Sequence, residues 1–321
     1  MTTTNFKVAV LDDYLGIAHT MAPWDTLAPA ADVHFLTEPI KAEQRAQRLA
    51  DYDVLVLMRE RMPLPAELIR KLPELKLVIT TGQRNAGIDL AACAERNIPV
   101  LGTRSLSNIT IETAWLLILA LIKRLKANAL TADSHTWQNA LPDSLNGQTL
   151  GIVGLGGLGS QMAVVAKAFG MEVLAWSQNL TKEAAGAVGA TWVDKFELLQ
   201  RSDIVTLHLR LSPRTRNIIG APELAAMKPE AFLINTSRAG LVEEQALLEA
   251  LRTSRIAGAG LDVFPEEPIP ADQPLLALDN VVLTPHLGYV SKQSMQIYYR
   301  DVVENIAQWQ QGKLIRVVSE E

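Results

Sequence analysis

One stretch decides the fold of this chain: Thr149-Leu150-Gly151-Ile152-Val153-Gly154-Leu155-Gly156-Gly157-Leu158-Gly159. In it, an apolar run of strand length leads directly into glycines spaced G-x-G-x-x-G. Residues 161–169, which follow, contain neither proline nor glycine and carry apolar side chains at helical spacing. Strand, glycine turn and helix in this order are typical of a dinucleotide-binding unit, although glycine-rich turns also occur in other α/β proteins.

Each glycine of this turn has a distinct physical task. Gly154 permits the tight turn, Gly156 lets the backbone approach a pyrophosphate, and Gly159 lets the helix pack closely on the strand. The N-terminus of the helix that follows offers free N–H groups and a positive dipole end to phosphate. We therefore expect Gly154, Gly156, Leu158 and Gly159 to bind the cofactor.

Size and composition narrow the class of protein. The chain has 321 residues, of which 48% are hydrophobic, and this favours two domains over one. Its formal net charge of −5, with no run of Lys or Arg, argues against a nucleic-acid partner.

The longest apolar run, 114–122, is too short to span a membrane, and residues 1–20 do not resemble a signal peptide. A single cysteine fits a reducing compartment, so we expect a cytoplasmic protein. No cluster of side chains has metal-ligand spacing, so no metal is expected.

Short apolar runs alternate with helical patterns along the chain, which predicts βαβ units and parallel sheets. Between residues 149 and 285 we expect five or six strands, enough for one complete doubly wound domain. Residues 108–127 read as an almost uninterrupted helix that is apolar around much of its circumference. Such a helix is expected to be buried between elements or at a subunit interface. The predicted strands are 6–11, 33–36, 54–58, 77–80, 98–101, 149–153, 173–176, 203–207, 232–235, 257–262 and 281–284, and the other predicted helices include 42–49, 66–72, 161–169 and 291–311.

The identity of the dinucleotide depends on the end of the second strand of this domain. An acidic residue about 20 positions past the glycines usually accepts hydrogen bonds from the adenosine ribose. Here the strand ends with Ser177, Gln178 and Asn179, and no acid is present. A 2′-phosphate meets no repulsion from these side chains, which are able to donate hydrogen bonds to it, with Lys182 nearby. Both NAD and NADP therefore stay open as cofactors.

Candidate catalytic groups follow three predicted strands, where ligands of parallel sheets bind. They are Arg238, Glu267 and His286. Arginine holds a carboxylate through two parallel hydrogen bonds, and histidine transfers protons near neutral pH when a carboxylate supports its second nitrogen. Taken singly, each residue has an ordinary structural explanation: Arg238 as part of a surface ion pair, Glu267 as a turn carboxylate, and His286 as part of a capped loop. Their joint placement at strand ends favours reduction of a carbonyl beside a carboxylate.

Two loops earlier in the chain also follow predicted strands. They read Arg59-Glu60-Arg61 and Thr81-Gly82-Gln83-Arg84-Asn85. Either loop is a candidate for anion binding, and the alternative for both is a solvated turn with surface charge.

Taken in order, these motifs resemble those of the D-isomer-specific 2-hydroxyacid dehydrogenases over essentially the whole chain. They are 154–159, 235–238, 261–268 and 284–286. The resemblance implies an α/β protein with two doubly wound parallel-sheet domains. A Rossmann dinucleotide-binding domain, 104–288, would be inserted into a flavodoxin-like substrate-binding domain, 1–103 plus 289–321. It also implies a homodimer built largely through the nucleotide domains.

The same resemblance implies a role for each motif residue. Arg238 binds the carboxylate and carbonyl of the substrate, His286 is the acid–base, and Glu267 keeps it protonated. Asp262 contacts the nicotinamide carboxamide, His208 lies beside the ribose-phosphate, and Thr236 belongs to the cofactor site.

The substrate site is implied to lie in the loop after the predicted strand 77–80. The backbone of Thr81, Gly82 and Gln83 would meet the substrate carboxylate. The loop lacks a second glycine that many members have near this point, so substrate size does not carry over. If Arg84 or Arg59 points inward, an additional anionic group on the substrate is expected.

Two functions of different classes are compatible with this fold. The first is an oxidoreductase that reduces a small 2-keto acid, similar to glyoxylate or hydroxypyruvate, to the D-2-hydroxy acid. A phosphorylated or dicarboxylic substrate is the runner-up within this class. The second is a nicotinamide-nucleotide-sensing co-regulator without turnover. A sensor has no need of an arginine, a glutamate and a histidine together, so the sequence favours the enzyme.

Overall fold

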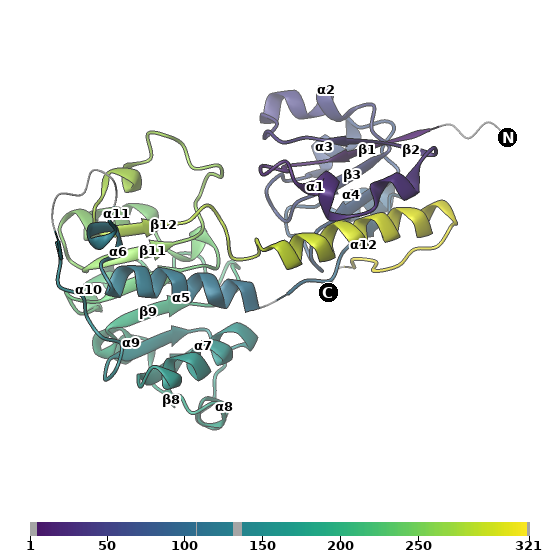
Figure 1. Ribbon diagram of the computed structural model, residues 1–321. Helices are drawn as coiled ribbons and strands as arrows, with labels where there is room; N and C mark the ends of the chain where they lie inside the picture. Colours follow the sequence, from purple (N-terminus) through teal and green to yellow (C-terminus); the bar gives the residue numbers. More distant parts are fainter. Residues whose placement is uncertain (1–4, 107, 131–136, 320–321) are drawn as a thin grey trace. The chain divides into compact units, whose positions relative to one another are not determined.

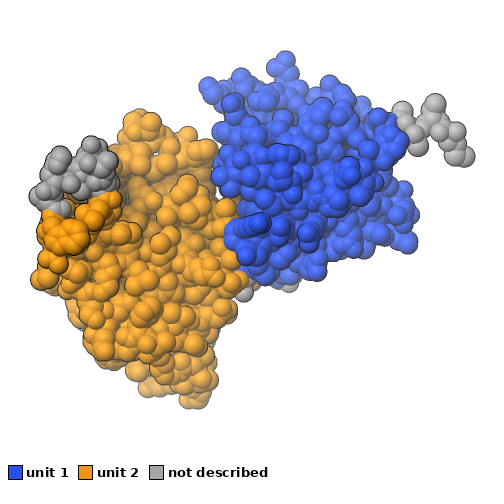
Figure 2. All heavy atoms as spheres, in the orientation of Figure 1, with its two compact units in different colours: residues 1–106, 291–321 blue, residues 107–290 orange. Residues whose placement is uncertain are grey.

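The computed structural model describes residues 5–106, 108–130 and 137–319. These residues form two compact units (Figure 2). Unit 1 comprises residues 1–106 and 291–321, and unit 2 comprises residues 107–290. Each unit contains one parallel sheet with helices packed on it (Figure 1). No helix of the described residues is long and apolar enough to cross a membrane.

Unit 1 contains a five-stranded sheet in the order β2-β1-β3-β4-β5. All of its strand pairs are parallel. The strands are β1 (Phe6–Val10), β2 (Ala31–Phe35), β3 (Val54–Leu57), β4 (Leu77–Thr80) and β5 (Val100–Leu101). The helices are α1 (Ala18–Met21), α2 (Arg45–Leu49), α3 (Ala66–Arg70), α4 (Leu90–Glu95) and α12 (Lys292–Gln310), with 3-10 turns η1 (Trp24–Leu27) and η2 (Ala42–Gln44).

The central strands of unit 1 are apolar because both of their faces are covered. All four residues of β3 and all four of β4 are buried. Helices α2, α3 and α4 contribute to one core cluster with the strands. The long helix α12, yellow in Figure 1, packs beside α1 and η1, and its residues Tyr298 and Tyr299 are among the largest fully buried side chains. Ser291 caps this helix by accepting a hydrogen bond from the N–H of Ser294 (3.1 Å).

Unit 2 contains a seven-stranded parallel sheet in the order β12-β11-β10-β9-β6-β7-β8. The strands are β6 (Thr149–Val153), β7 (Glu172–Trp176), β8 (Thr191–Trp192), β9 (Ile204–Leu207), β10 (Phe232–Asn235), β11 (Gly258–Leu261) and β12 (Val281–Leu283). The helices are α5 (Asn108–Ile122), α6 (Leu125–Asn128), α7 (Gly157–Ala168), α8 (Lys182–Ala187), α9 (Lys195–Arg201), α10 (Ala221–Ala226) and α11 (Glu244–Arg252), with 3-10 turns η3 (Ala239–Leu241) and η4 (Pro274–Ala277).

Alternate residues of these strands serve two separate cores, as expected for side chains with a period of two. Ile152 of β6 and Ile234 of β10 pack with α5 and α7 in one cluster. Their neighbours Val153 and Leu233 pack with α9, α10 and α11 in the other. The sheet is therefore covered by helices on both faces, which confirms the predicted doubly wound fold class.

Three local predictions were wrong. The helix expected over 108–127 breaks after Ile122, because Arg124 adopts a left-handed conformation (φ 50°), and α6 then starts at Leu125. The guanidinium of Arg124 lies 5.4 Å from the centroid of the Phe232 ring, a contact that an uninterrupted helix pattern does not reveal. Unit 2 has seven strands instead of five or six, because the two-residue strand β8 is too short to leave a periodic signal. Helix α7 begins at Gly157, within the glycine motif, and not at residue 161.

Candidate active site

The catalytic candidates of unit 2 follow three neighbouring strands. Arg238 comes after β10, Asp262 and Glu267 after β11, and His286 after β12. Since β10, β11 and β12 are adjacent and parallel, their carboxyl ends meet at one edge of the sheet. The structure therefore brings these groups to a common edge.

His286 and Glu267 form a close pair. The Nδ1 atom of His286 lies 2.6 Å from Oε2 of Glu267, and both side chains are about three-quarters or more buried. The other carboxylate oxygen of Glu267 accepts a hydrogen bond from the N–H of Phe264 (2.9 Å). With Nδ1 engaged, the second ring nitrogen of His286, Nε2, is the one left to exchange a proton with a substrate.

The charge state of Glu267 is set by competing effects. Burial by itself raises the pKa of this carboxyl group. The hydrogen bond from His286, its positive charge, the Phe264 N–H and the charge of Arg238 together outweigh burial, so the pKa of Glu267 lies below its usual range. Glu267 is therefore a carboxylate at neutral pH and stabilises a protonated His286.

Asp262 holds the loop that carries His286. Its Oδ1 accepts hydrogen bonds from the hydroxyl of Thr284 (2.6 Å) and the N–H of Leu287 (2.6 Å). Its Oδ2 accepts one from the N–H of Gly288 (2.7 Å). Burial raises the pKa of Asp262 despite these bonds. His286 itself adopts a left-handed conformation (φ 53°), and these hydrogen bonds hold the backbone on both sides of it.

The turn that carries Arg238 is fixed by side chains of its own motif. Asn235 donates a hydrogen bond from Nδ2 to the carbonyl of Arg238 (2.9 Å) and accepts one from the N–H of Ser237 (3.0 Å). Ser237 in turn donates a hydrogen bond to the carbonyl of Leu207 at the end of β9 (2.7 Å). Thr236 is buried, and its hydroxyl makes no hydrogen bond within the described chain.

The glycine turn combines two crowded positions with one open position. A Cβ added at Gly159 would lie 2.1 Å from the carbonyl oxygen of Gly154, and one at Gly154 would lie 2.6 Å from the carbonyl oxygen of His208. These two positions therefore require glycine for packing, and Gly154 also has a positive φ of 106°. At Gly156, in contrast, an added Cβ would meet nothing within 4 Å. Gly156 is the N-cap residue of α7, so this open space lies beside the N-terminus of the helix. Free N–H groups at a helix N-terminus favour the binding of phosphate. Leu158 is half-buried and packs against the core beneath this turn.

His208 lies beside the glycine turn, as its backbone N–H donates to the carbonyl of Val153 (2.8 Å). Its Nε2 atom lies 2.9 Å from the hydroxyl of Thr206, and its Nδ1 is buried without a hydrogen bond in the described residues. Burial lowers the pKa of His208 to about 4, so the ring is neutral at physiological pH. A neutral ring leaves one nitrogen to bond a ligand group at this position.

The end of β7 carries polar side chains. Ser177 is half-buried, and Gln178 and Asn179 are exposed. The backbone carbonyl of Ser177 accepts a hydrogen bond from the N–H of Leu180 (3.1 Å), whereas the three side chains make none with the residues that the structure describes. Lys182 opens α8 with its Nζ 5.5 Å from the centroid of the Trp192 ring. The site thus contains hydrogen-bond donors and lacks a carboxylate.

In unit 1, fewer backbone N–H groups of the predicted substrate loop are available to a substrate than the sequence implied. The N–H of Thr81 donates to the carbonyl of Leu57 (2.9 Å), and the N–H of Gly82 donates to the hydroxyl of Thr103 (2.7 Å). Both N–H groups are thus occupied within the fold. Gln83 is exposed, and its N–H makes no hydrogen bond in the described part of the chain. Of these three residues, Gln83 is the one whose backbone is available to an anion.

Arg59 lies against this loop. A Cβ added at Gly82 would lie 1.9 Å from Nη1 of Arg59, so the guanidinium rests where only glycine leaves space. The N–H of Arg59 donates to the hydroxyl of Thr81 (2.9 Å), and Asn85 donates to the carbonyl of Arg59. Arg59 is half-buried, whereas Arg84 is exposed.

Two neighbours of these groups were not identified from the sequence. The ring of Tyr289 lies edge-on to His286, with centroids 5.2 Å apart. The hydroxyl of Thr103 accepts the hydrogen bond from the N–H of Gly82, a contact that the sequence did not predict. Neither residue stands in a motif with a recognisable spacing. The described residues bring no three His, Cys, Asp or Glu together as a metal site.

Comparison with known proteins identifies the family of this chain. The family model described as "D-isomer specific 2-hydroxyacid dehydrogenase, NAD binding domain" matches residues 115–288. The chain is 37% identical over 276 residues to D-3-phosphoglycerate dehydrogenase of Methanocaldococcus jannaschii, which covers 85% of this chain and 52% of the relative. The chain therefore spans about half the length of that relative.

Other relatives match over most of their length. Glyoxylate reductase of Thermococcus litoralis is 36% identical, with coverage of 84% of this chain and 83% of the relative. The crystal structure of phosphoglycerate oxidoreductase from Vibrio cholerae O395 superposes with a TM-score of 0.90 at 35% identity, covering 96% of this chain and 100% of that one. On these matches, the chain belongs to the D-isomer-specific 2-hydroxyacid dehydrogenases and carries their NAD-binding domain.

Proposed function

We propose that this protein reduces a small 2-keto acid to the D-2-hydroxy acid with NADH or NADPH. Glyoxylate and hydroxypyruvate are the first candidates. The observation that carries the proposal is the pair of His286 and Glu267, whose nitrogen and oxygen lie 2.6 Å apart at the sheet edge that also carries Arg238.

Each group then has a defined task. A bound reduced nicotinamide supplies the hydride that reduces the carbonyl carbon of the keto acid. The carbonyl oxygen must gain a proton, which His286 donates from Nε2 while the Glu267 carboxylate stabilises its charge. Arg238 holds the substrate carboxylate and polarises the carbonyl. In unit 1, the N–H of Gln83 is the proposed donor to the substrate carboxylate, and Arg59 and Arg84 are the candidates for binding a further anionic group.

The proposed cofactor residues follow the glycine turn. The N-terminus of α7 after Gly156 holds the pyrophosphate, with Gly154 and Gly159 shaping the turn and Leu158 beneath it. Thr236 and His208 offer a hydroxyl and a neutral ring nitrogen, each without a hydrogen bond in the described chain. Asp262 was predicted to contact the carboxamide. Since both of its oxygens already bind the His286 loop, we propose that it acts mainly by positioning that loop.

A turnover assay tests this function. Wild-type protein is mixed with NADH or NADPH and a panel of glyoxylate, hydroxypyruvate, pyruvate, phenylpyruvate and 2-ketoglutarate, and oxidation of the nicotinamide is followed by absorbance. Turnover of at least one acid, with chiral analysis showing the D product, supports the proposal. Tight nucleotide binding with no turnover on any acid would overturn it in favour of a nucleotide sensor.

Cofactor choice is expected to respond to Ser177. The Ser177→Asp variant places a carboxylate where a 2′-phosphate would lie, so its preference should shift toward NADH by about 100-fold in the ratio of kcat/KM values. Thr181→Asp is the matched control. It adds the same charge four residues later, at the cap of α8, where Asp also caps a helix, and the ratio should stay unchanged. An unchanged ratio in Ser177→Asp would show that this position does not face the ribose.

We also propose a cytoplasmic homodimer formed through unit 2. Large apolar side chains are exposed on this unit, including Trp137 (78% exposed) and Leu141 (91%). These two residues lie four positions apart in the chain, and exposed apolar side chains that gather in one patch are typical of protein interfaces. Light scattering is expected to give twice the chain mass of 35.1 kDa for wild type and a single chain mass for Leu141→Asp combined with Trp137→Ser. Leu15→Asp, at a 65% exposed position of unit 1, should remain dimeric. A monomeric wild type would contradict the proposal.

A further inference from the structure

Gly82 is held through both of its backbone groups by one residue, Thr103. The N–H of Gly82 donates to the Thr103 hydroxyl (2.7 Å), and the N–H of Thr103 donates to the carbonyl of Gly82 (2.8 Å). Thr103 is 2% exposed. At Gly102, an added Cβ would lie 2.7 Å from the same Gly82 carbonyl oxygen, so the two backbones run in direct contact. The position of Gly82, and of Gln83 after it, thus depends on the segment 102–104.

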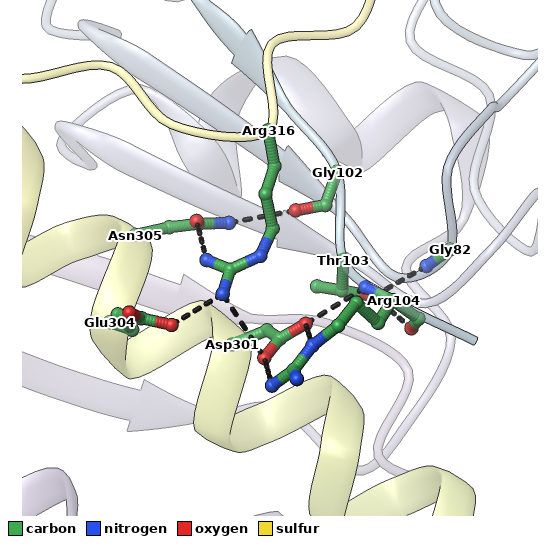
Figure 3. A network of polar contacts seen from close by, with 8 residues as sticks. All are labelled: Gly82, Gly102, Thr103, Arg104, Asp301, Glu304, Asn305 and Arg316. Atoms are coloured by element: carbon green, nitrogen blue, oxygen red, sulfur yellow. Dashed lines mark hydrogen bonds and ion pairs between the residues drawn. The ribbon is translucent and has the colours of Figure 1, made fainter.

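That segment is in turn fixed by a buried carboxylate on α12 (Figure 3). Asp301 is 1% exposed and accepts hydrogen bonds from the backbone N–H of Arg104 (2.8 Å) and from its side-chain atoms Nε (3.1 Å) and Nη2 (2.7 Å). The Nη2 atom of Arg316 approaches it on the other side (3.5 Å). Burial alone raises the pKa of Asp301, but the bonds from Arg104 and the charges of Arg316 and Arg104 lower it overall, so the carboxylate stays ionised.

Further contacts attach the same segment to α12 and to the chain after it. Asn305 donates from Nδ2 to the carbonyl of Gly102 (2.8 Å) and accepts from Nη1 of Arg316 (2.8 Å). The N–H of Gly102 donates to the carbonyl of Arg316 (2.8 Å), and Arg316 also pairs with Glu304. The backbone of residues 102–104 is therefore bound on one side by α12 and the C-terminal segment, and on the other by Gly82.

We propose that Thr103 and Asp301 are positioning residues for substrate binding, which hold the Gln83 N–H in place through Gly82 and the segment 102–104. This inference rests on the proposed function, because it concerns the donor that meets the substrate carboxylate. Neither side chain is assigned a contact with the reacting atoms in this proposal. Because these contacts already hold the loop in place before the anion binds, binding costs less backbone entropy.

The first test is Thr103→Val, which keeps the shape of the side chain and removes its hydroxyl. The Gly82 N–H then loses its acceptor, and KM for the best keto acid should rise about tenfold while the dissociation constant for the reduced dinucleotide stays unchanged. Thr103→Ser restores the hydroxyl and should restore KM to near wild type. A wild-type KM in Thr103→Val together with a raised KM in Thr103→Ser would mean that the methyl packing of Thr103 matters and its hydroxyl does not, and would overturn the proposal.

The second test is Asp301→Asn, which has the same size but places an amide among arginine donors. Asp301 contacts Arg104 and reaches Gly82 only through Thr103, so a smaller rise in KM, about three- to fivefold, is expected. Asp53→Asn is the matched control. Asp53 is also a buried carboxylate of unit 1, and it accepts hydrogen bonds from the backbone N–H of Lys7 (2.8 Å) and from Nζ of Lys76 (2.7 Å). It directly precedes β3, however, and so lies at the amino-terminal end of that strand, whereas Gly82 follows the carboxyl end of β4. Its variant should be destabilised without a change in KM.

Hydrogen exchange separates this inference from the proposed function. The network predicts faster exchange in the peptide spanning 81–84 in Thr103→Val and in Asp301→Asn, but not in Asp53→Asn, whether or not the protein turns over a keto acid. Unchanged exchange at 81–84 in Thr103→Val would overturn the coupling. Faster exchange with unchanged KM would overturn the positioning role. A wild type that reduces no 2-keto acid would instead overturn the proposed function, with exchange still deciding the coupling.

Discussion

Replacing His286 by asparagine is expected to lower kcat for keto-acid reduction about 1000-fold and to leave binding of the reduced dinucleotide unchanged. The amide nitrogen of asparagine takes the place of Nδ1 and keeps the bond to Glu267, while the proton donor at Nε2 is lost. Asparagine also tolerates the left-handed backbone at this position (φ 53°), so the loop need not rearrange. Stopped-flow kinetics for the chemical step and fluorescence titration of the nucleotide measure the two quantities.

Two comparisons make this prediction specific. His34 of unit 1 also pairs with a carboxylate, since its Nε2 lies 3.1 Å from Asp32, and His34→Asn should retain full activity. In Glu267→Gln the charge that stabilises protonated His286 is removed. The kcat for keto-acid reduction should therefore fall in this variant, because the proton donor is no longer paired with a carboxylate. Full activity in His286→Asn would exclude this residue as the proton donor.

Replacing Arg238 by lysine is expected to lower kcat/KM for the keto acid about 1000-fold, although the positive charge is retained. Lysine cannot make the two parallel hydrogen bonds by which arginine holds a carboxylate, and each charge-assisted bond contributes roughly 1.5–3 kcal/mol. The loss should appear in both KM and kcat, because the same guanidinium polarises the carbonyl. Steady-state kinetics over a range of keto-acid concentrations separates the two contributions.

The control for Arg238 is Arg201→Lys in the same unit. Arg201 is a half-exposed arginine that pairs with Glu172 (2.8 Å) and Glu197 (2.6 Å), and exposed pairs of this kind contribute little. Its variant should behave as wild type. A lysine at position 238 that supports normal kcat/KM would mean that Arg238 acts only through its charge, and two-point binding of the carboxylate would be wrong.

Local signals in the sequence were sufficient for the fold class and for the catalytic candidates. Strands β4 and β10 begin and end where the apolar runs predict, because all four residues of each strand are buried. Gly159 could be identified because its packing partner, the carbonyl oxygen of Gly154, lies five residues away. Gly154 is crowded by the distant His208, so the motif spacing alone identified it. Arg238, Glu267 and His286 could be grouped because parallel strands bring their carboxyl ends to one edge.

Tertiary structure alone decided how these positions are supported. The sequence could not tell which N–H of the 81–83 loop remains available, because the acceptor for Gly82 lies 21 residues away on Thr103. It also could not connect Arg104 with Asp301, which is 197 residues distant. For the same reason, the sequence did not predict the left-handed break at Arg124 or the three hydrogen bonds that Asp262 accepts from the His286 loop. Periodicity and motif spacing report on neighbours along the chain, whereas these hydrogen bonds form only after distant segments have packed together.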